Sequence, residues 1–114
     1  MLLDFSDMGE VAIPHMNGGA GLVVARMHAN GWGKAMLATL APGCSIGGHV
    51  QATSVDVNYV VSGRGVATCD GVEEELRPGV CHICPMGSEH SIANTGDDDL
   101  VLFTVVAEQP REGA

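Results

Sequence analysis

The chain has 114 residues, 46% of them hydrophobic, and carries 5 basic against 14 acidic side chains for a formal net charge of −9. This length supports one domain, which we assign to residues 1–114, and the hydrophobic content is too high for a disordered chain. The acidic charge repels nucleic acid and anionic lipid, so we expect neither as a partner.

The first residues and the apolar runs argue against secretion and against membrane insertion. The chain begins with acidic side chains, whereas a secretory signal begins with a basic region. The longest apolar run, Leu100–Ala107, is far shorter than the roughly 20 residues that span a bilayer. We therefore expect a cytoplasmic protein with no membrane partner, in which cysteines stay reduced.

In chain order, the predicted elements begin with a short turn near Phe5–Met8, after which short apolar runs alternate with turn residues. Residues 1–21 are expected to form either an N-terminal arm or a strand exchanged in a dimer. The predicted strands are Leu22–His28, Lys34–Ala41, Ser45–Gln51, Val57–Ser62, Val66–Cys69, Glu73–Leu76, Val80–Cys84, His90–Ala93 and Leu100–Glu108. This spacing is typical of an antiparallel sandwich or barrel, and Asp70-Gly71 is a hairpin signal.

Cys81 and Cys84 form a CxxC pattern, which invites a zinc or redox interpretation. Residues three apart on a strand point to opposite faces, however, and the chain has no second ligand pair of the kind that a structural zinc site requires. We interpret these thiols as small apolar fillers or as supporting groups around a site.

A small set of polar residues is expected to converge inside the barrel. His49 and Gln51 lie two apart on a strand and share one face, while Asp56 follows a turn and His90 begins another strand. If these strands are neighbours, two imidazoles, one carboxylate and one amide oxygen meet. Two histidines and one carboxylate are a ligand set for Fe(II) and related divalent ions, with Gln51 as an optional fourth ligand.

Two short motifs also carry a family resemblance. In the pattern G(X)5HXH(X)3-4E(X)6G, Gly43, His49 and Gly63 stand at the required spacings, with Gln51 at the second His position and Asp56 at the Glu position. The pattern G(X)5PXG(X)2H(X)3N is complete, with Gly79, Pro85, Gly87, His90 and Asn94. Over residues 43–94 the chain therefore resembles the cupin superfamily, with a short spacer between the motifs.

This resemblance implies an all-β fold, the double-stranded β-helix (cupin or jelly-roll barrel). It also implies one divalent metal ion in the barrel mouth and usually a homodimer. The metal ligands it implies are His49, Gln51, Asp56 and His90, and the ion expected is Fe, Mn, Ni or Zn. An amide oxygen and a shorter carboxylate should bind late first-row ions less tightly than the family's three histidines and one glutamate. A metal-free site that uses polar side chains for acid–base work is the alternative.

Strand alternation extends this site by two catalytic candidates. Asn58 shares the face of Asp56 and is expected to line the cavity, whereas Tyr59 points to the opposite face. His82 shares a face with Cys84, and if that face is the inner one, His82 is a candidate base for moving a proton. Asn94 is expected to fix the following loop through its side-chain amide.

The barrel does not determine the reaction, because one fold hosts many activities. Our first hypothesis is a metal-dependent enzyme of the isomerase or lyase type acting on a small polar metabolite such as a sugar, uronate or keto acid. The alternatives are an Fe(II)-dependent dioxygenase and a non-catalytic module that binds a small molecule or a metal. Bound iron with substrate-dependent dioxygen uptake would favour the dioxygenase.

Overall fold

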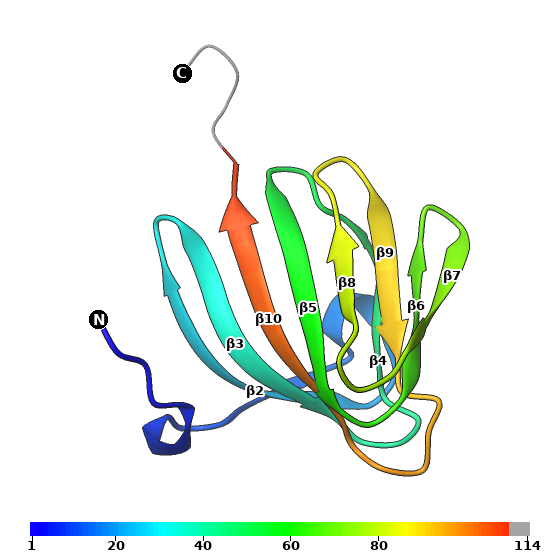
Figure 1. The fold of residues 1–114 in the computed structure, drawn as a ribbon, viewed down its shortest axis with the longest axis horizontal. Helices are drawn as coiled ribbons and strands as arrows, with labels where there is room; N and C mark the ends of the chain where they lie inside the picture. The colour runs from blue at the N-terminus through cyan, green and yellow to red at the C-terminus, as the bar shows by residue number, and fades with distance from the viewer. Residues whose placement is uncertain (110–114) are drawn as a thin grey trace.

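Two antiparallel sheets face each other in the computed structural model, which describes residues 1–109 (Figure 1). The larger sheet contains, in order, β1 (Val11–Pro14), β2 (Leu22–Asn30), β3 (Gly33–Leu40), β10 (Leu100–Glu108), β5 (Ser54–Ser62) and β8 (Cys81–Cys84). The smaller sheet contains β4 (Ser45–Val50), β9 (Glu89–Ala93), β6 (Gly65–Cys69) and β7 (Val72–Leu76). Two short 3-10 helices, η1 (Phe5–Asp7) and η2 (Met16–Gly18), precede β2.

The strands pair as one long hairpin folded back on itself. β6 pairs with β7, β5 with β8, β4 with β9 and β3 with β10, and successive pairs alternate between the two sheets. This nested pairing is the double-stranded β-helix, so the predicted all-β fold is confirmed. At the centre of the nest, Asp70 and Gly71 have positive φ values of 48° and 82° and form the predicted two-residue turn.

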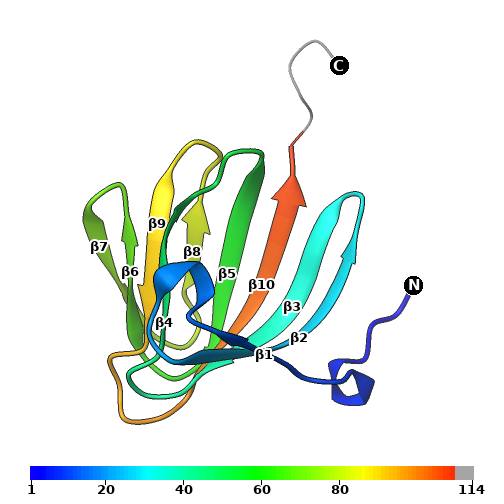
Figure 2. The same ribbon diagram turned by 180° about the vertical axis from the view of Figure 1, so that it is seen from behind.

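All nine predicted strands are present, with shifts of a few residues at their ends. The largest difference is β5, which begins at Ser54 rather than Val57 because Ser54 and Asp56 already pair with β10. The N-terminal segment also contains a strand, β1, which pairs with β2 of the same chain; Figure 2 shows it from behind. Exchange of this segment in a dimer stays a prediction, and the predicted domain of residues 1–114 extends beyond the described residues.

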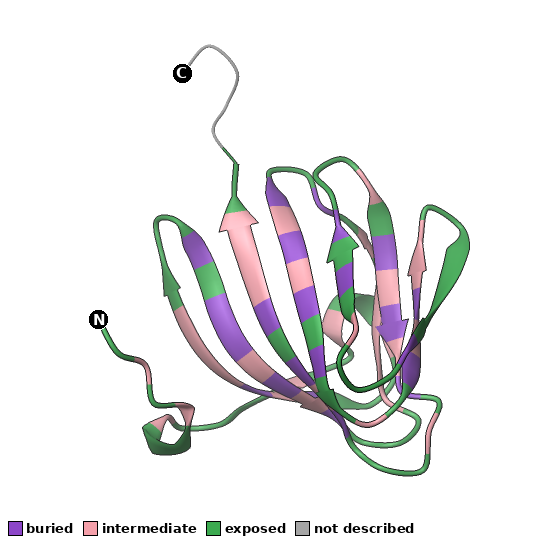
Figure 3. Cartoon of the chain, viewed as in Figure 1, coloured by how far each residue is buried: buried purple, intermediate pink, exposed green. Residues whose placement is uncertain are grey.

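The interior of the barrel is divided into an apolar half and a polar half, which follow from the order of residues along the inner faces of the strands. The inward side chains of β5 run from Asp56 and Asn58 to Val60, and those of β10 run in the opposite direction from Leu102 to Thr104. Figure 3 shows buried and less buried positions alternating along these strands. Because the strands are antiparallel, the apolar residues meet at one end and the polar residues at the other.

Two glycines let η2 and the residue after it pack closely over β4. A side chain at Gly47 would collide with the carbonyl oxygen of Asn17, and one at Gly19 would collide with the carbonyl oxygen of Ser45. The register between β4 and β9 shifts between Ile46 and His49, which marks a bulge beside this contact. Glycine at these positions is thus required by the close approach of backbones, and η2 covers one side of the polar half.

The predicted role of Asn94 is confirmed. Its Nδ2 atom donates to the carbonyl oxygens of Leu40 and Asp98, each at 2.8 Å, and its Oδ1 atom accepts from the N–H of Gly96 at 2.9 Å. Asn94 therefore fixes the loop between β9 and β10. In the part of the chain that the structure describes, no helix has the length and apolar character needed to cross a bilayer.

Candidate functional site

The polar half of the barrel contains a cavity of about 310 Å³. Its lining includes His49, Gln51, Asp56, Asn58 and His90, together with apolar side chains of both sheets. Ligand pockets in proteins start at about this volume, so the cavity suits a small metabolite.

Three ligand-bearing side chains meet at the wall of this cavity. Among residues 1–109, His49, Asp56 and His90 place one ligand atom each within 4.8 Å of one another. Nε2 of His90 lies 3.0 Å from Nε2 of His49 and 3.0 Å from Oδ2 of Asp56. The structure thus brings together three of the four predicted metal ligands, and Gln51 lies between them.

Strand register explains this convergence. His49 on β4 stands directly opposite His90 on β9 in the smaller sheet. Asp56 lies across the cavity on β5 of the larger sheet. The bulge in β4 matters here, because it allows Ile46 and His49, which are three apart, both to line the cavity.

Gln51 occupies the centre of the cluster with its amide. Its Nε2 atom lies 3.0 Å from Nε2 of His49, 3.1 Å from Nε2 of His90 and 3.3 Å from Oδ2 of Asp56, while its Oε1 atom accepts from the Ser54 hydroxyl at 2.8 Å. An amide has only two hydrogens, so it cannot satisfy all three of these acceptors. If the Gln51 side-chain amide were flipped by 180°, Oε1 would face the cluster. Nε2 would then donate to the Ser54 hydroxyl, because a hydroxyl oxygen also accepts.

The chemistry of these donors fits a divalent cation. Nδ1 of His49 lies 2.9 Å from the carbonyl oxygen of Gly47 and must donate to it, which leaves Nε2 of His49 as a lone pair directed at the cluster. Oδ1 of Asp56 is buried and has no hydrogen-bond partner among the described residues. A buried carboxylate with an unsatisfied oxygen next to imidazole lone pairs is the environment that a bound cation would satisfy.

Asn58 presents a second unsatisfied group to the cavity. Its Oδ1 atom accepts from the hydroxyl of Thr104 at 2.8 Å, whereas its Nδ2 atom is buried without a partner in the described part of the chain. Thr104 lies directly opposite Asn58 on β10 and also lines the cavity. Sequence reasoning missed Thr104, although its place two residues after Leu102 puts it on the inner face.

His82 faces inward but does not line the cavity. It lies behind His90, with the two rings stacked at a centroid distance of 5.2 Å, and its Nε2 atom is 3.0 Å from Nδ1 of His90. Its Nδ1 atom is 2.6 Å from Oε1 of Glu74 on β7. Glu74 was not expected near the site, since it belongs to a run of three acids; the only signal was its alternation with the inward Leu76.

The two cysteines of the CxxC pattern lie on opposite faces of β8, as expected from their spacing. Cys81 is exposed, whereas Cys84 is buried behind Asp56, its neighbour on β5. Burial raises the pKa of the Cys84 thiol to about 12, and the nearby thiol of Cys69 adds to this effect. None of the four cysteines, all within the described residues, forms a disulfide.

Charged side chains stand at the rim of the cavity. Lys34 on β3 and Glu108 at the end of β10 both line it, and Glu108 accepts a hydrogen bond from Thr53 at 2.9 Å. Lys34 is the only basic side chain among the cavity-lining residues that the structure describes. The rim of the cavity therefore carries one positive and one negative side chain.

Comparison with known proteins supports the same fold. An oxalate-binding protein from Thermotoga maritima is 33% identical over 67 residues, which make up 59% of this chain and 55% of that protein. The chain thus matches just over half the length of this curated relative.

Solved structures match over the whole barrel. A predicted oxalate decarboxylase from Thermotoga maritima superposes with a TM-score of 0.90 at 26% identity, over 96% of this chain and 100% of that chain. An RmlC-like cupin from Shewanella frigidimarina superposes with a TM-score of 0.78 at 17% identity, over 99% of this chain and 95% of that chain. The second likeness concerns the fold alone.

The family model that describes the cupin domain matches residues 36–106, a range that contains both motifs and all residues of the cluster. This match, on a chain folded as a double-stranded β-helix, shows that the chain belongs to the cupin domain family.

Proposed function

We propose that this protein is a divalent-metal-dependent cupin that binds a small carboxylic or oxo acid and acts on it by lyase or isomerase chemistry. The observation that carries the proposal is the cluster of His49, Asp56 and His90, whose ligand atoms lie within 4.8 Å of one another beside a cavity. Gln51 is the proposed fourth ligand and would bind through its Oε1 atom once the side-chain amide has flipped.

The ion we propose is Fe, Mn, Ni or Zn, since imidazole suits all four and the carboxylate tolerates each of them. A bound ion would supply Lewis-acid polarisation of a substrate oxygen. His49 and Asp56 approach it from opposite sheets, so their positions are held by the barrel and need little adjustment on binding.

The class of substrate follows from the groups around the cluster. The unpartnered Nδ2 atom of Asn58 is a buried donor that a carboxylate or carbonyl oxygen of a ligand would satisfy. Lys34, which stands at the rim together with Glu108, would attract the carboxylate of a ligand. The relatives named for oxalate binding and oxalate decarboxylation also support a small carboxylate, and Asn58 is our candidate for orienting it.

A non-catalytic binding module is the second candidate, because the curated relative is named for binding rather than turnover. We also propose a homodimer and a cytoplasmic location; the unpaired cysteines among the described residues support a reducing compartment.

The first test measures metal binding and the contribution of Asp56. Wild-type protein stripped of metal is titrated with Mn(II), Fe(II), Ni(II) and Zn(II), and the rise in melting temperature is recorded for each ion. We expect Asp56→Asn to lower metal affinity more than about 100-fold, since loss of a mere hydrogen-bond partner of a ligand costs 10–100-fold. The metal-free variant should be no less stable than the wild type, because the change removes a buried, incompletely satisfied charge.

Asp98→Asn is the matched control, since Asp98 is an exposed acid in the loop before β10. It should leave metal affinity unchanged. If the wild type binds none of the four ions, or if both variants bind as the wild type does, the proposed metal site is wrong.

Turnover separates the candidate functions. The metal-loaded protein is mixed with oxalate and with 2-oxo acids, and product formation and dioxygen uptake are followed. Product without dioxygen uptake supports a lyase or isomerase, dioxygen uptake with iron supports the dioxygenase, and saturable binding without product supports the binding module.

A further inference from the structure

We infer that Glu74 and His82 are positioning residues that fix the proton arrangement of His90, so that Nε2 of His90 faces the cluster as a lone pair. This inference rests on the proposed function, because the lone pair of His90 has a role only if the cluster binds a metal. The proton arrangement itself belongs to the metal-free protein and is tested there.

A continuous row of short polar contacts carries the inference. Nδ1 of His82 lies 2.6 Å from Oε1 of Glu74, and Nε2 of His82 lies 3.0 Å from Nδ1 of His90. Nε2 of His90 then lies 3.0 Å from Oδ2 of Asp56. Two imidazoles therefore stand in a row with a carboxylate at each end.

When each imidazole carries one proton, as the test at pH 8 is designed to ensure, two continuous arrangements of the protons exist along this row. In the first, His82 donates from Nδ1 to Glu74 and His90 donates from Nδ1 to His82, which leaves Nε2 of His90 free to bind a cation. In the second, His90 donates from Nε2 to Asp56 and His82 donates from Nε2 to His90. This second arrangement places a proton where the ion would bind, and it turns the lone pair of His82 towards Glu74.

The shorter contact at the Glu74 end favours the first arrangement. The ring nitrogen and carboxylate oxygen are 2.6 Å apart at Glu74 and 3.0 Å apart at Asp56, so two facing lone pairs would repel more strongly at the Glu74 end, and a proton there relieves the larger repulsion. Gln51 completes the arrangement, since its amide hydrogens can serve both imidazole lone pairs at 3.0 and 3.1 Å. His49 is oriented independently, by the carbonyl oxygen of Gly47.

The fold places Glu74 in this role. The tight turn between β6 and β7 sets the register in which Glu74 shares the inner face of β7 with the buried Leu76. The His82 side chain is 1% exposed and that of Glu74 is 51% exposed, so these contacts run from the protein surface to His90 without crossing the cavity. Glu73 and Glu75, which flank Glu74 on the same strand, point to the other face.

The test uses Glu74→Gln, a change at a half-exposed position that is compatible with folding. A glutamine can donate to or accept from Nδ1 of His82, so it no longer selects one proton arrangement. We expect the affinity for Zn(II) or Co(II), measured against a competing chelator, to fall by about tenfold or more. Glu74→Asp keeps the carboxylate and should retain part of the affinity.

The second readout is which ring nitrogen of His90 carries the proton. This tautomer would not change if Glu74 had only a structural role. In two-bond ¹H–¹⁵N spectra of the metal-free protein at pH 8, we expect the wild type to carry the His90 proton on Nδ1. Glu74→Gln should shift this proton population towards Nε2. Glu73→Gln is the matched control, with the same loss of charge and no contact to His82, and it should change neither the spectrum nor the affinity.

Each contrary result overturns the inference. A wild-type His90 protonated on Nε2, an unchanged spectrum and affinity in Glu74→Gln, or equal loss of affinity in Glu73→Gln would do so. A wild type that binds no metal contradicts the proposed function instead, because the spectrum of the metal-free protein still decides the proton arrangement.

Discussion

Gln51 stands where the motif pattern has an imidazole, and this changes how the site behaves without a metal. A third imidazole would add one more lone pair to a cluster that already contains two of them and a carboxylate. The Gln51 amide instead places its Nε2 atom, which carries two hydrogens, 3.0 Å from Nε2 of His49 and 3.1 Å from Nε2 of His90. Gln51 thus relieves part of the repulsion among the metal-free ligand atoms. In return, its amide is a weaker ligand for the ion than an imidazole would be.

The sulfur atoms of β8 should differ strongly in reactivity. Because the pKa of the buried Cys84 thiol is raised to about 12, it stays protonated at pH 8 to 9, whereas Cys81 is exposed. We expect iodoacetamide to label Cys84 at least about tenfold more slowly than Cys81, as followed by peptide mass spectrometry. Comparable labelling of both residues in the native protein would contradict the burial of Cys84.

The same pKa shift makes the stability of the protein depend on alkaline pH. The unfolded thiol ionises near pH 9 while the folded thiol does not, so the free energy of unfolding should fall as the pH rises from about 9 towards 12. Urea unfolding at pH 8 and pH 10 measures this loss. Cys84→Ala is the control, and it should show a smaller loss between the two pH values than the wild type.

Individual site residues differ in how far the sequence predicts them. Motif spacing and strand alternation predict that His49, Gln51, Asp56 and His90 share a region, since both depend only on local geometry. Glu74 could not be found in this way. Its contact with His82 joins strands of different sheets, and such a contact depends on how the sheets pack, which no local pattern encodes.

At the scale of elements, the β4 bulge and η2 are the features that the sequence pattern missed. Strict alternation would place Ile46 and His49 on opposite faces, and the bulge brings both to the cavity. The segment that holds β1 and η2 was predicted either as an arm or as a strand exchanged in a dimer, because both elements are short and several glycines follow them. Their structure depends on contact with β2 and β4 rather than on their own periodicity.

The contact between η2 and β4 should be sensitive to single methyl groups. We expect Gly47→Ala to lower the free energy of unfolding by about 1–3 kcal/mol, because the added Cβ would collide with the backbone oxygen of Asn17. The variant should also bind metal more weakly, since the carbonyl of Gly47 orients His49. Urea denaturation and metal titration measure the two effects.

Gly48→Ala is the matched control for this prediction. Its Cβ would meet only the end of the Glu89 side chain, at 3.2 Å, and that side chain is able to move away. We expect Gly48→Ala to cost less than Gly47→Ala. Equal stability of the two variants would mean that η2 does not pack on β4 in solution.

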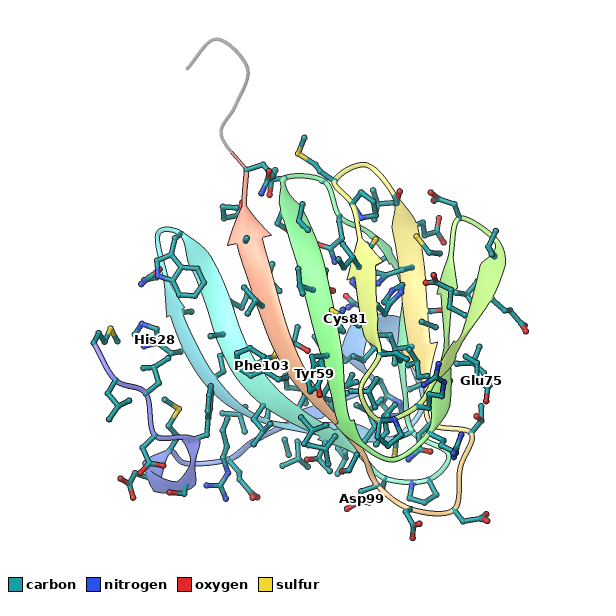
Figure 4. The ribbon with its side chains drawn as sticks, viewed as in Figure 1. His28, Tyr59, Glu75, Cys81, Asp99 and Phe103 are labelled. Atoms are coloured by element: carbon teal, nitrogen blue, oxygen red, sulfur yellow. The ribbon has the colours of Figure 1, made fainter. Side chains whose placement is uncertain are left out.

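For the whole molecule, the outer face of the larger sheet is the region that a second copy would cover. Phe103, Tyr59 and Cys81 stand in one cross-strand row on β10, β5 and β8, and all three are exposed (Figure 4). Phe5 of the N-terminal segment packs edge-on against Phe103 at 6.1 Å and covers one end of the row. Exposed aromatic side chains in register are typical of a protein interface.

We therefore expect the proposed homodimer to use this face. Tyr59→Lys should give a monomer in light scattering coupled to size-exclusion chromatography, because it places a charge at the centre of the row. Val72→Lys, at an exposed position of β7 in the other sheet, should remain a dimer. If the wild type is a monomer, or if both variants dimerise, the interface lies elsewhere or does not exist.

The nested pairing of the strands has a further consequence, for the order in which the barrel forms during folding. The residues that pair in β6 and β7 are separated only by the Asp70-Gly71 turn, whereas each pair further out closes a longer loop. Loop-closure entropy grows with length, so among the nested pairs the innermost hairpin is the least costly to close, and we expect the outer pairs to be added around it. The cluster needs β4, β5 and β9, which pair further out in the nest, so we expect it to form after the hairpin that carries Glu74.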